Sequence, residues 1–189
     1  MEKLRTFVAV EVDEAIKKRF GVLEGKLKEA GGDVRWVEAG NVHITLKFLG
    51  HVEYIELSQV KDVIREAVAG LETFCIRFKG VGAFPKPERP RVIFVGIQDD
   101  TDSLARINSG LERGFFEKLG IKKEGRRYSP HLTLGRVKST KGIDPLVRLV
   151  VQHSSDDLGE ELVGNVVLMQ SQLSSKGPIY TKLESFGLD

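Results

Sequence analysis

Apolar residues along the first 84 positions follow two spacings, one typical of strands and one typical of helices. Residues 4–11 form a short apolar run, which predicts a strand. Residues 13–29 repeat apolar side chains every three or four positions behind Asp13, which predicts a capped helix. The same criteria predict strands at 34–37, at the segment that carries His43 and at 73–84, and a helix at 55–69.

A proline-rich segment, PKPERP at 85–90, interrupts this pattern, because prolines so close together cannot continue a helix or a strand. After it the order of elements starts again, with an apolar run at 91–97 and helical spacing from Leu104 to Phe115. A strand that carries His131, a helix near 145–153 and strands near 163–173 and 178–186 complete the prediction.

Two strand-like segments share a four-residue pattern of His, apolar, Thr and Leu. The first is NVHITLKFLG at 41–50, and the second is SPHLTLGR at 129–136. Because side chains alternate along a strand, each His lies on the same face as the Thr two positions later, and the apolar residues pack beneath. The two polar pairs are His43 with Thr45 and His131 with Thr133.

A second landmark indicates that the whole chain is an internal repeat. Arg5 precedes His43 by 38 residues and Arg91 precedes His131 by 40. We therefore expect residues 1–189 to form a single bilobal domain with a repeat of approximately 1–88 and 89–189. The expected class is α+β, with two pseudosymmetric lobes, each a mainly antiparallel sheet with helices, around a central groove where the motifs face each other.

One His-x-Thr pattern alone would be weak evidence, because structural histidines are common in strands. Two such patterns among four His and seven Thr arise by chance roughly once in a hundred sequences. The remaining histidines, His51 and His153, lack this neighbour and are predicted to be surface residues. The paired motif is therefore the leading candidate for chemistry.

Composition narrows the class of protein. Apolar residues make up 41% and charged residues 30%, which is typical of a folded domain. The sequence contains neither a signal-peptide pattern nor an apolar run long enough to cross a membrane, so we expect a cytoplasmic protein with no membrane partner. Cys75 is the single cysteine, so a disulfide framework is excluded. It lies in a predicted buried strand position.

Charge is unevenly distributed although the net charge is only +2. The stretch from Lys118 to Lys141 is rich in Lys and Arg and contains a single acidic residue, Glu124. This basic stretch surrounds the second motif, so it can attract a polyanionic ligand or simply form a solvated surface.

Other catalytic signatures are absent from the sequence. It has no Cys-x-x-Cys, no His-Glu-x-x-His and no Asp-rich loop, so we expect no metal site. GIKKEGRR at 120–127 has P-loop glycine spacing, but arginines replace the Lys and the Ser or Thr. Two facing histidines instead suit in-line displacement at phosphorus, in which one imidazole takes a proton from water and the other protonates the departing oxygen. Threonine hydroxyls can bind the phosphoryl oxygens, and no cofactor is required.

The motifs HITL and HLTL, together with RTFVAV, KFLG, YSPHLTLGR and GPIYTKLESF, resemble the two-histidine phosphoesterases. They resemble most closely the RNA 2′,3′-cyclic phosphodiesterases, formerly called 2′-5′ RNA ligases. The resemblance spans nearly the whole chain. It implies a bilobal fold and hydrolysis of a 2′,3′-cyclic phosphate at an RNA 3′ end to a 2′-phosphate, with a weak reverse ligation.

The resemblance also implies roles for single residues. His43 corresponds to the proton donor for the O3′ leaving group and His131 to the proton acceptor that activates water, whereas the near-identical motifs alone cannot distinguish these roles. Thr45 and Thr133 correspond to the phosphate-binding threonines. Arg136 corresponds to the family's arginine at this spacing. The candidates for stacking a ring on a base are Phe7, Phe48, Tyr128 and Tyr180. Strict alternation places Arg136 on the wrong face, so this assignment requires a bulge or a strand end.

Several alternatives remain open at this stage. The chain could be a phosphodiesterase for a small nucleotide cyclic phosphate, or a non-catalytic module that binds RNA or 2′-5′-oligonucleotides. A physiological ligase is a third hypothesis. The expected partner is RNA with 2′,3′-cyclic phosphate ends, with tRNA fragments among the candidates, and the expected state is a monomer.

Overall fold

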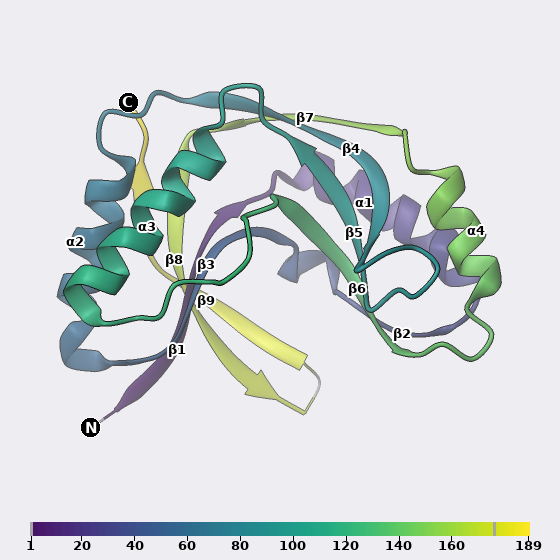
Figure 1. Ribbon diagram of the computed structural model, residues 1–189, viewed down its shortest axis with the longest axis horizontal. Coiled ribbons are helices and arrows are strands. Elements are labelled where there is room, and N and C mark those ends of the chain that lie inside the picture. Colours follow the sequence, from purple (N-terminus) through teal and green to yellow (C-terminus); the bar gives the residue numbers. More distant parts are fainter. Residues whose placement is uncertain (1, 176) are drawn as a thin grey trace.

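The computed structural model describes residues 2–175 and 177–189. The helices are distributed among the strands along the chain (Figure 1). In order, the elements are β1 (Lys3–Glu11), α1 (Glu14–Glu29), β2 (Asp33–Trp36), η1 (Ala39–Asn41), β3 (His43–Glu53), η2 (Tyr54–Glu56), α2 (Leu57–Val68), β4 (Phe74–Phe84), β5 (Val92–Gln98), α3 (Ser103–Leu119), β6 (His131–Ser139), α4 (Asp144–Gln152), β7 (Asp157–Val163), β8 (Asn165–Ser174) and β9 (Gly177–Gly187).

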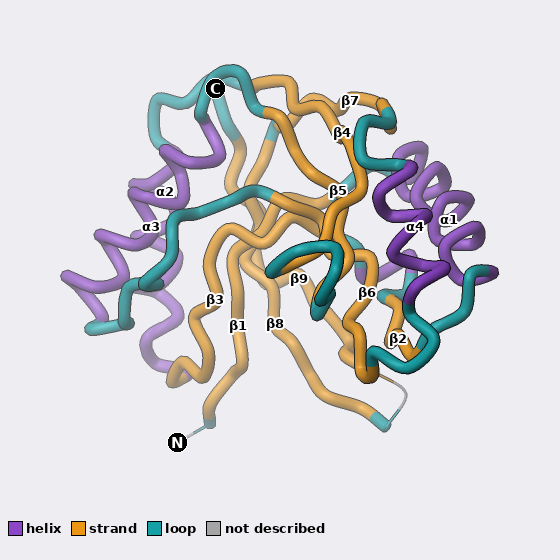
Figure 2. Tube along the Cα trace, turned by 45° about the vertical axis from the view of Figure 1, so that its right-hand side comes forward, coloured by secondary structure: helices purple, strands orange, loops and turns teal. Residues whose placement is uncertain are grey.

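All nine strands of the described residues belong to one antiparallel sheet, in the order β7-β4-β5-β6-β3-β1-β8-β9, and β2 pairs with the outer part of β6. The predicted α+β class with a mainly antiparallel sheet is confirmed. Helices α2 and α3 contact the half that contains β3 and β9, whereas α1 and α4 contact the half that contains β4 and β7 (Figure 2). Each half takes strands from both ends of the sequence, a crossing that the linear pattern does not reveal.

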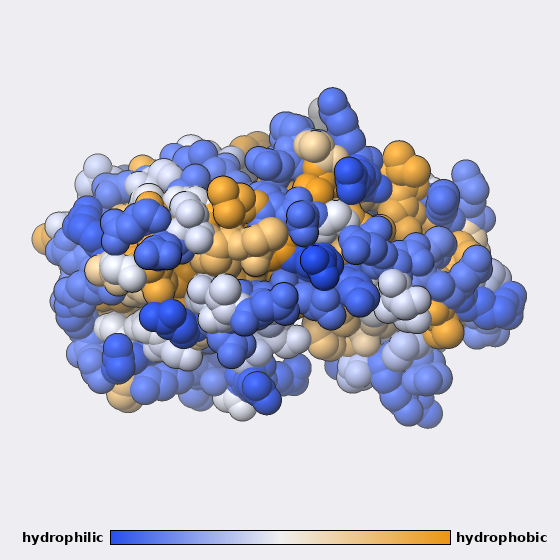
Figure 3. Space-filling model, turned by 90° about the horizontal axis from the view of Figure 1, so that it is seen from above, coloured by the Kyte–Doolittle hydropathy of each residue, from blue (hydrophilic) through white to orange (hydrophobic). Residues whose placement is uncertain are grey.

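The helices pack on one face of the sheet. In β1, Val8 and Val10 belong to the main core cluster, which also contains the apolar faces of the helices, whereas Phe7 and Ala9 form a small cluster on the opposite face. Hydrophilic residues cover most of the surface seen from above, and the hydrophobic ones form separate patches (Figure 3). No helix within the described residues has the length and apolarity needed to cross a membrane.

Two predictions about strands were wrong. Strand β7 was not predicted, because DLGEELV contains four acidic or glycine positions and little alternation. Cys75 lies in β4 as expected, but its side chain is exposed. Its neighbours Phe74 and Ile76 take the core face, so the alternation of the strand turns Cys75 outwards.

Candidate functional site

The two His-Thr motifs meet where the two halves of the sheet join. The only residues paired between β3 and β6 within the described chain are Ile44 and Leu132. Counting one residue in each direction along these antiparallel strands places His43 across from Thr133. The same count places Thr45 across from His131. All four polar side chains are half-buried on one face, and directly opposite side chains in a sheet are close enough to interact.

Both imidazoles are oriented by the same backbone contact. The Nδ1 atom of His43 lies 2.8 Å from the carbonyl oxygen of Asn41, and Nδ1 of His131 lies 2.8 Å from the carbonyl oxygen of Ser129. A carbonyl oxygen only accepts a hydrogen bond, so Nδ1 carries the proton in each ring. The Nε2 atoms are therefore the ones available to exchange protons with a ligand.

Aromatic rings enclose His43. The Phe7 ring lies 4.7 Å from the imidazole centroid, and the Tyr180 ring lies 5.2 Å away in an edge arrangement. Burial lowers the pKa of His43, and the hydrogen bond to Asn41 opposes part of this effect. Burial also raises the pKa of Tyr180, so its phenol stays protonated beside the imidazole.

His131 has its own pair of rings, which the sequence analysis missed. Phe84 lies 5.1 Å and Phe94 5.6 Å from the imidazole, and these two rings stack 4.2 Å apart. Phe94 packs over Gly82, where a Cβ atom would approach its ring to 2.5 Å. The available signal was that Phe84 and Phe94 lie on either side of the proline-rich segment that precedes the second motif.

The repeat alignment explains why Phe94 was missed. Matching Arg5 with Arg91 pairs Phe94 with the core residue Val8. In the structure, however, Phe94 pairs with the motif threonine Thr133, and Ala9 pairs with the corresponding threonine Thr45. The equivalent of Phe94 is therefore Ala9 and not Val8. The alignment of these strands was therefore wrong by one residue, and a shift of one residue moves a side chain to the other face.

A β-bulge follows each threonine and determines which later residue reaches the same face. In β3 the pairing passes from Thr45 to Lys47, and in β6 it passes from Thr133 to Gly135. The extra residue returns Phe48 and Arg136 to the face of the histidines. The bulge that the sequence analysis required for Arg136 is thus present, and Arg136 is exposed.

The remaining ring candidates differ in accessibility. Phe48 is 53% exposed, whereas Phe7 is 3% exposed beneath the His43 ring. Tyr128 packs against the main core and donates its hydroxyl hydrogen to the carbonyl oxygen of Thr45 over 3.2 Å. Burial raises the pKa of Tyr128, so this phenol remains a donor and links the loop before β6 to the first motif.

The two other histidines lie outside the motif pairs. His51 is exposed in β3, as predicted. His153 is half-buried after α4, with Nδ1 2.6 Å from a carboxylate oxygen of Asp156, so the prediction of a plain surface residue was wrong. Among the residues that the structure describes, no His, Cys, Asp and Glu side chains gather in a group of three that could hold a metal ion.

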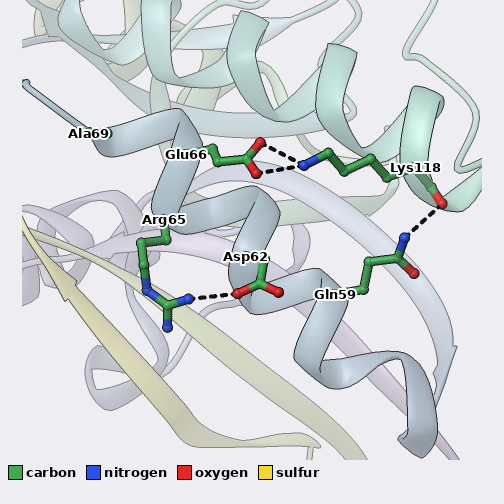
Figure 4. Close-up of a pocket in the computed structure, with 6 residues that line it drawn as sticks. All are labelled: Gln59, Asp62, Arg65, Glu66, Ala69 and Lys118. Carbon is green, nitrogen blue, oxygen red and sulfur yellow. Dashed lines mark hydrogen bonds and ion pairs between the residues drawn. The ribbon is translucent and has the colours of Figure 1, made fainter.

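A hollow of about 600 Å³ between α2 and α3 is separate from the motifs (Figure 4). Its lining residues are Gln59, Asp62, Arg65, Glu66, Ala69 and Lys118. Lys118 bonds both carboxylate oxygens of Glu66, and Arg65 pairs with Asp62 at 2.7 Å. The first cation of the basic stretch is therefore neutralised on the outer surface.

Comparison with known proteins identifies the family. A family model described as the 2′-5′ RNA ligase superfamily matches residues 13–172. The chain belongs to this superfamily. Among curated members of the superfamily, the RNA 2′,3′-cyclic phosphodiesterase of Methanothermobacter thermautotrophicus is 37% identical over 98% of this chain and 100% of that protein. The protein of the same name from Archaeoglobus fulgidus is 37% identical over 97% and 99%.

Solved structures share the fold of this chain. The protein TT0787 of Thermus thermophilus has a TM-score of 0.80 at 27% identity, with 98% of both chains covered. Escherichia coli LigT complexed with 3′-AMP has a TM-score of 0.81 at 21% identity, with 99% of both chains covered. At that lower identity the likeness concerns the fold alone.

Proposed function

We propose that this chain is an RNA 2′,3′-cyclic phosphodiesterase, which hydrolyses the cyclic phosphate at an RNA 3′ end to a 2′-phosphate. One observation carries the proposal: two imidazoles, each with Nδ1–H bonded to a carbonyl, lie diagonally across from each other with a threonine beside each. Two proton-transfer groups on either side of one phosphate are what in-line hydrolysis requires. Relatives named for this activity are similar to almost the whole chain.

The proposed mechanism assigns one proton transfer to each histidine. Nε2 of His131 accepts a proton from water, whose oxygen forms the new bond to phosphorus. The bond from phosphorus to O3′ breaks, and protonated His43 donates its Nε2 proton to that oxygen. The ring contacts around each imidazole hold these Nε2 atoms in place during the transfer. The products are a 3′-hydroxyl and a 2′-phosphate, and the two histidines have exchanged protonation states.

Charge on the phosphoryl oxygens is stabilised by the groups between the histidines. The hydroxyls of Thr45 and Thr133 donate hydrogen bonds to the non-bridging oxygens. The guanidinium of Arg136, brought to this face by the bulge after Thr133, adds positive charge. Burial lowers the pKa of His43 in the free protein, and the phosphate anion offsets this effect when substrate binds.

Exposure favours Phe48 as the ring that stacks on the terminal base, because it is accessible on the histidine face. Phe7 and Tyr128 are better placed to support His43 and Thr45. Tyr180, half-buried beside His43, remains a candidate contact to the sugar or base.

We propose RNA ends bearing 2′,3′-cyclic phosphate as the substrate, with tRNA fragments among them, for a cytoplasmic monomer formed by a single domain of residues 1–189. In 2′-5′ ligation an RNA 5′-hydroxyl takes the place of water: its oxygen bonds phosphorus, the bond from phosphorus to O3′ breaks, and the protons move as in hydrolysis. Because water is in large excess, hydrolysis is dominant. The competing functions are a non-catalytic module that binds RNA or 2′-5′-oligonucleotides and a phosphodiesterase for small cyclic nucleotides.

The decisive experiment incubates the purified protein, in EDTA and without ATP, with a short RNA that ends in a 2′,3′-cyclic phosphate. The terminal phosphate of the product is then identified. We expect a 2′-phosphate, and we expect His43→Ala and His131→Ala each to lower the rate by about 100- to 10,000-fold. His51→Ala is the control, because His51 is exposed on the same strand. Bound but uncleaved RNA would favour the binding module.

A further inference from the structure

Two arginines lie directly opposite each other beside the candidate active site. The antiparallel pairing of β2 with β6 places Arg35 across from Arg136, and both side chains are exposed. Like charges in this position destabilise a sheet. In the part of the chain that the structure describes, neither guanidinium forms an ion pair with a carboxylate. These two positive charges therefore do not stabilise the fold through an ion pair.

The β8–β9 hairpin reaches this part of the site. The side-chain amide of Asn41 donates a hydrogen bond to the carbonyl oxygen of Pro178 over 3.1 Å, which ties the hairpin to the residue that also orients His43. Tyr180 on this hairpin contacts the His43 ring. Arg35 also approaches this hairpin, because a Cβ atom on Gly177 would lie 3.7 Å from its Nη2 atom. The positive charges of Arg5, Arg136 and Arg35 lower the pKa of Tyr180 against the larger effect of burial.

The carboxylate of Glu11 lies nearby but does not neutralise the Arg35–Arg136 pair. Glu11 on β1 lies opposite His43, but its carboxylate pairs with Lys182 of β9. Arg136 is assigned to the reacting phosphate, which leaves Arg35 without a partner in the proposed reaction. A guanidinium fork suits a second phosphate group.

The position of the Arg35–Arg136 pair matches the polarity of an RNA strand. Arg136 follows Thr133, which lies across from His43, and Arg35 lies opposite Arg136, so these two arginines lie on the His43 side of the site. His43 is the proposed donor to O3′. In ribose, C3′ adjoins C4′, and C4′ carries the C5′ arm that leads to the preceding phosphodiester. Binding O3′ at His43 therefore directs that phosphodiester towards the arginines.

We propose that Arg35, beside Arg136, forms a second anion subsite, which binds the phosphodiester linking the last two nucleotides of the RNA. This inference rests on the proposed function and makes a substrate of two or more nucleotides better than a mononucleotide. Arg35 is then a specificity residue, and the repulsion between Arg35 and Arg136 is relieved when the substrate binds.

The test compares three substrates: a nucleoside 2′,3′-cyclic phosphate, a dinucleotide ending in 2′,3′-cyclic phosphate, and the same dinucleotide with an uncharged methylphosphonate linkage. We expect kcat/KM of the unaltered protein to be highest for the charged dinucleotide. Arg35→Gln should lower the ratio of dinucleotide to mononucleotide kcat/KM by about tenfold, which is a loss typical of one charge-assisted hydrogen bond. The variant should also lose discrimination against the methylphosphonate.

Arg77→Gln is the matched control, because Arg77 is an exposed strand arginine in β4 that pairs with Glu160. This control should keep the ratio of the unaltered protein. The thermal midpoint of Arg35→Gln should equal or exceed that of the unaltered protein, because a repulsion is removed. Equal losses on all three substrates, or no preference for the charged dinucleotide, would overturn the subsite. Failure of the proposed function is distinguishable, since the unaltered protein would then hydrolyse none of the three substrates or the mononucleotide alone.

Discussion

Each motif histidine, His43 and His131, bonds the backbone carbonyl oxygen two residues before it, but the surroundings of the two rings are not identical. His43 lies between a buried phenylalanine and the half-buried ring of Tyr180, and burial lowers its pKa. A proton donor must be charged before it can act. The proposed donor therefore depends on the substrate phosphate to hold its proton, which couples binding to protonation.

Titration of the free protein by NMR should reveal this coupling. We expect the imidazole of His43 to titrate below its ordinary value of 6.5 because it is buried. Adding inorganic phosphate should raise that pKa. Since folding lowers the pKa, the unfolded chain takes up the proton first as pH falls, so His43 destabilises the fold below about pH 6.5. A midpoint above 6.5 without phosphate would contradict this account.

The roles of the two histidines can be separated with a different leaving group. A p-nitrophenyl phosphodiester releases an anion that needs no proton. We expect His43→Ala to retain most of its activity on that substrate and His131→Ala to lose about 100-fold or more. Rates on the aryl ester and on a cyclic phosphate are compared for both variants. Larger retention in the His131 variant would reverse the assignment.

At the scale of elements, the repeated bulge is the feature that builds the site. Lys47 and Gly135 occupy the same position after the two threonines but differ in function. At Gly135 a Cβ atom would approach a methyl group of Val34 to 2.7 Å, so glycine allows β2 to pack there. Lys47 is instead buried and bonds Glu112 of α3.

Lys47 connects the motif strand to the loop before β6. Its Nζ atom lies 2.8 Å from Glu112 and donates to the carbonyl oxygen of Lys122, and the other carboxylate oxygen of Glu112 accepts the backbone N–H of Glu124. We expect Lys47→Met to lower the free energy of unfolding by about 3 kcal/mol, because Glu112 loses its partner in a largely buried setting.

Urea denaturation measures this change. Lys61→Met is the control, since Lys61 pairs with Glu184 at a more exposed position and should lose about 1 kcal/mol or less. Similar losses in the two variants would show that burial of Lys47 is not the cause.

At the scale of the whole molecule, two helix pairs cover the two halves of a single sheet, and β3 and β6 join these halves. One core cluster includes residues from both halves, among them Val10, Ile76, Leu111 and Leu146. The two motif histidines lie on either side of this junction. Their separation therefore depends on the two halves keeping one relative position.

We expect the chain to unfold in one cooperative step because its core is continuous. Fluorescence of Trp36, the single tryptophan, reports on β2, and far-UV circular dichroism reports on all elements. The two thermal transitions should coincide. Two separated midpoints would indicate that the halves unfold independently.

Local patterns in the sequence predicted most of the elements, the α+β class and the two motifs, because side-chain periodicity depends only on the backbone geometry of each element. They also predicted that each His shares a face with its Thr. These features follow from residues close together along the chain, such as His43 and Thr45.

Pairing between distant segments was decided by the tertiary structure alone. The bulges that bring Phe48 and Arg136 to the histidine face, the register that places Phe94 beside His131, and the hairpin that carries Tyr180 to His43 all depend on neighbouring strands. Strand β7 was missed for a local reason, because its segment alternates little, and Cys75 was misplaced because its two neighbours take the core face. A shift of one residue in strand pairing changes the face of every side chain, and the linear sequence contains no direct record of that register.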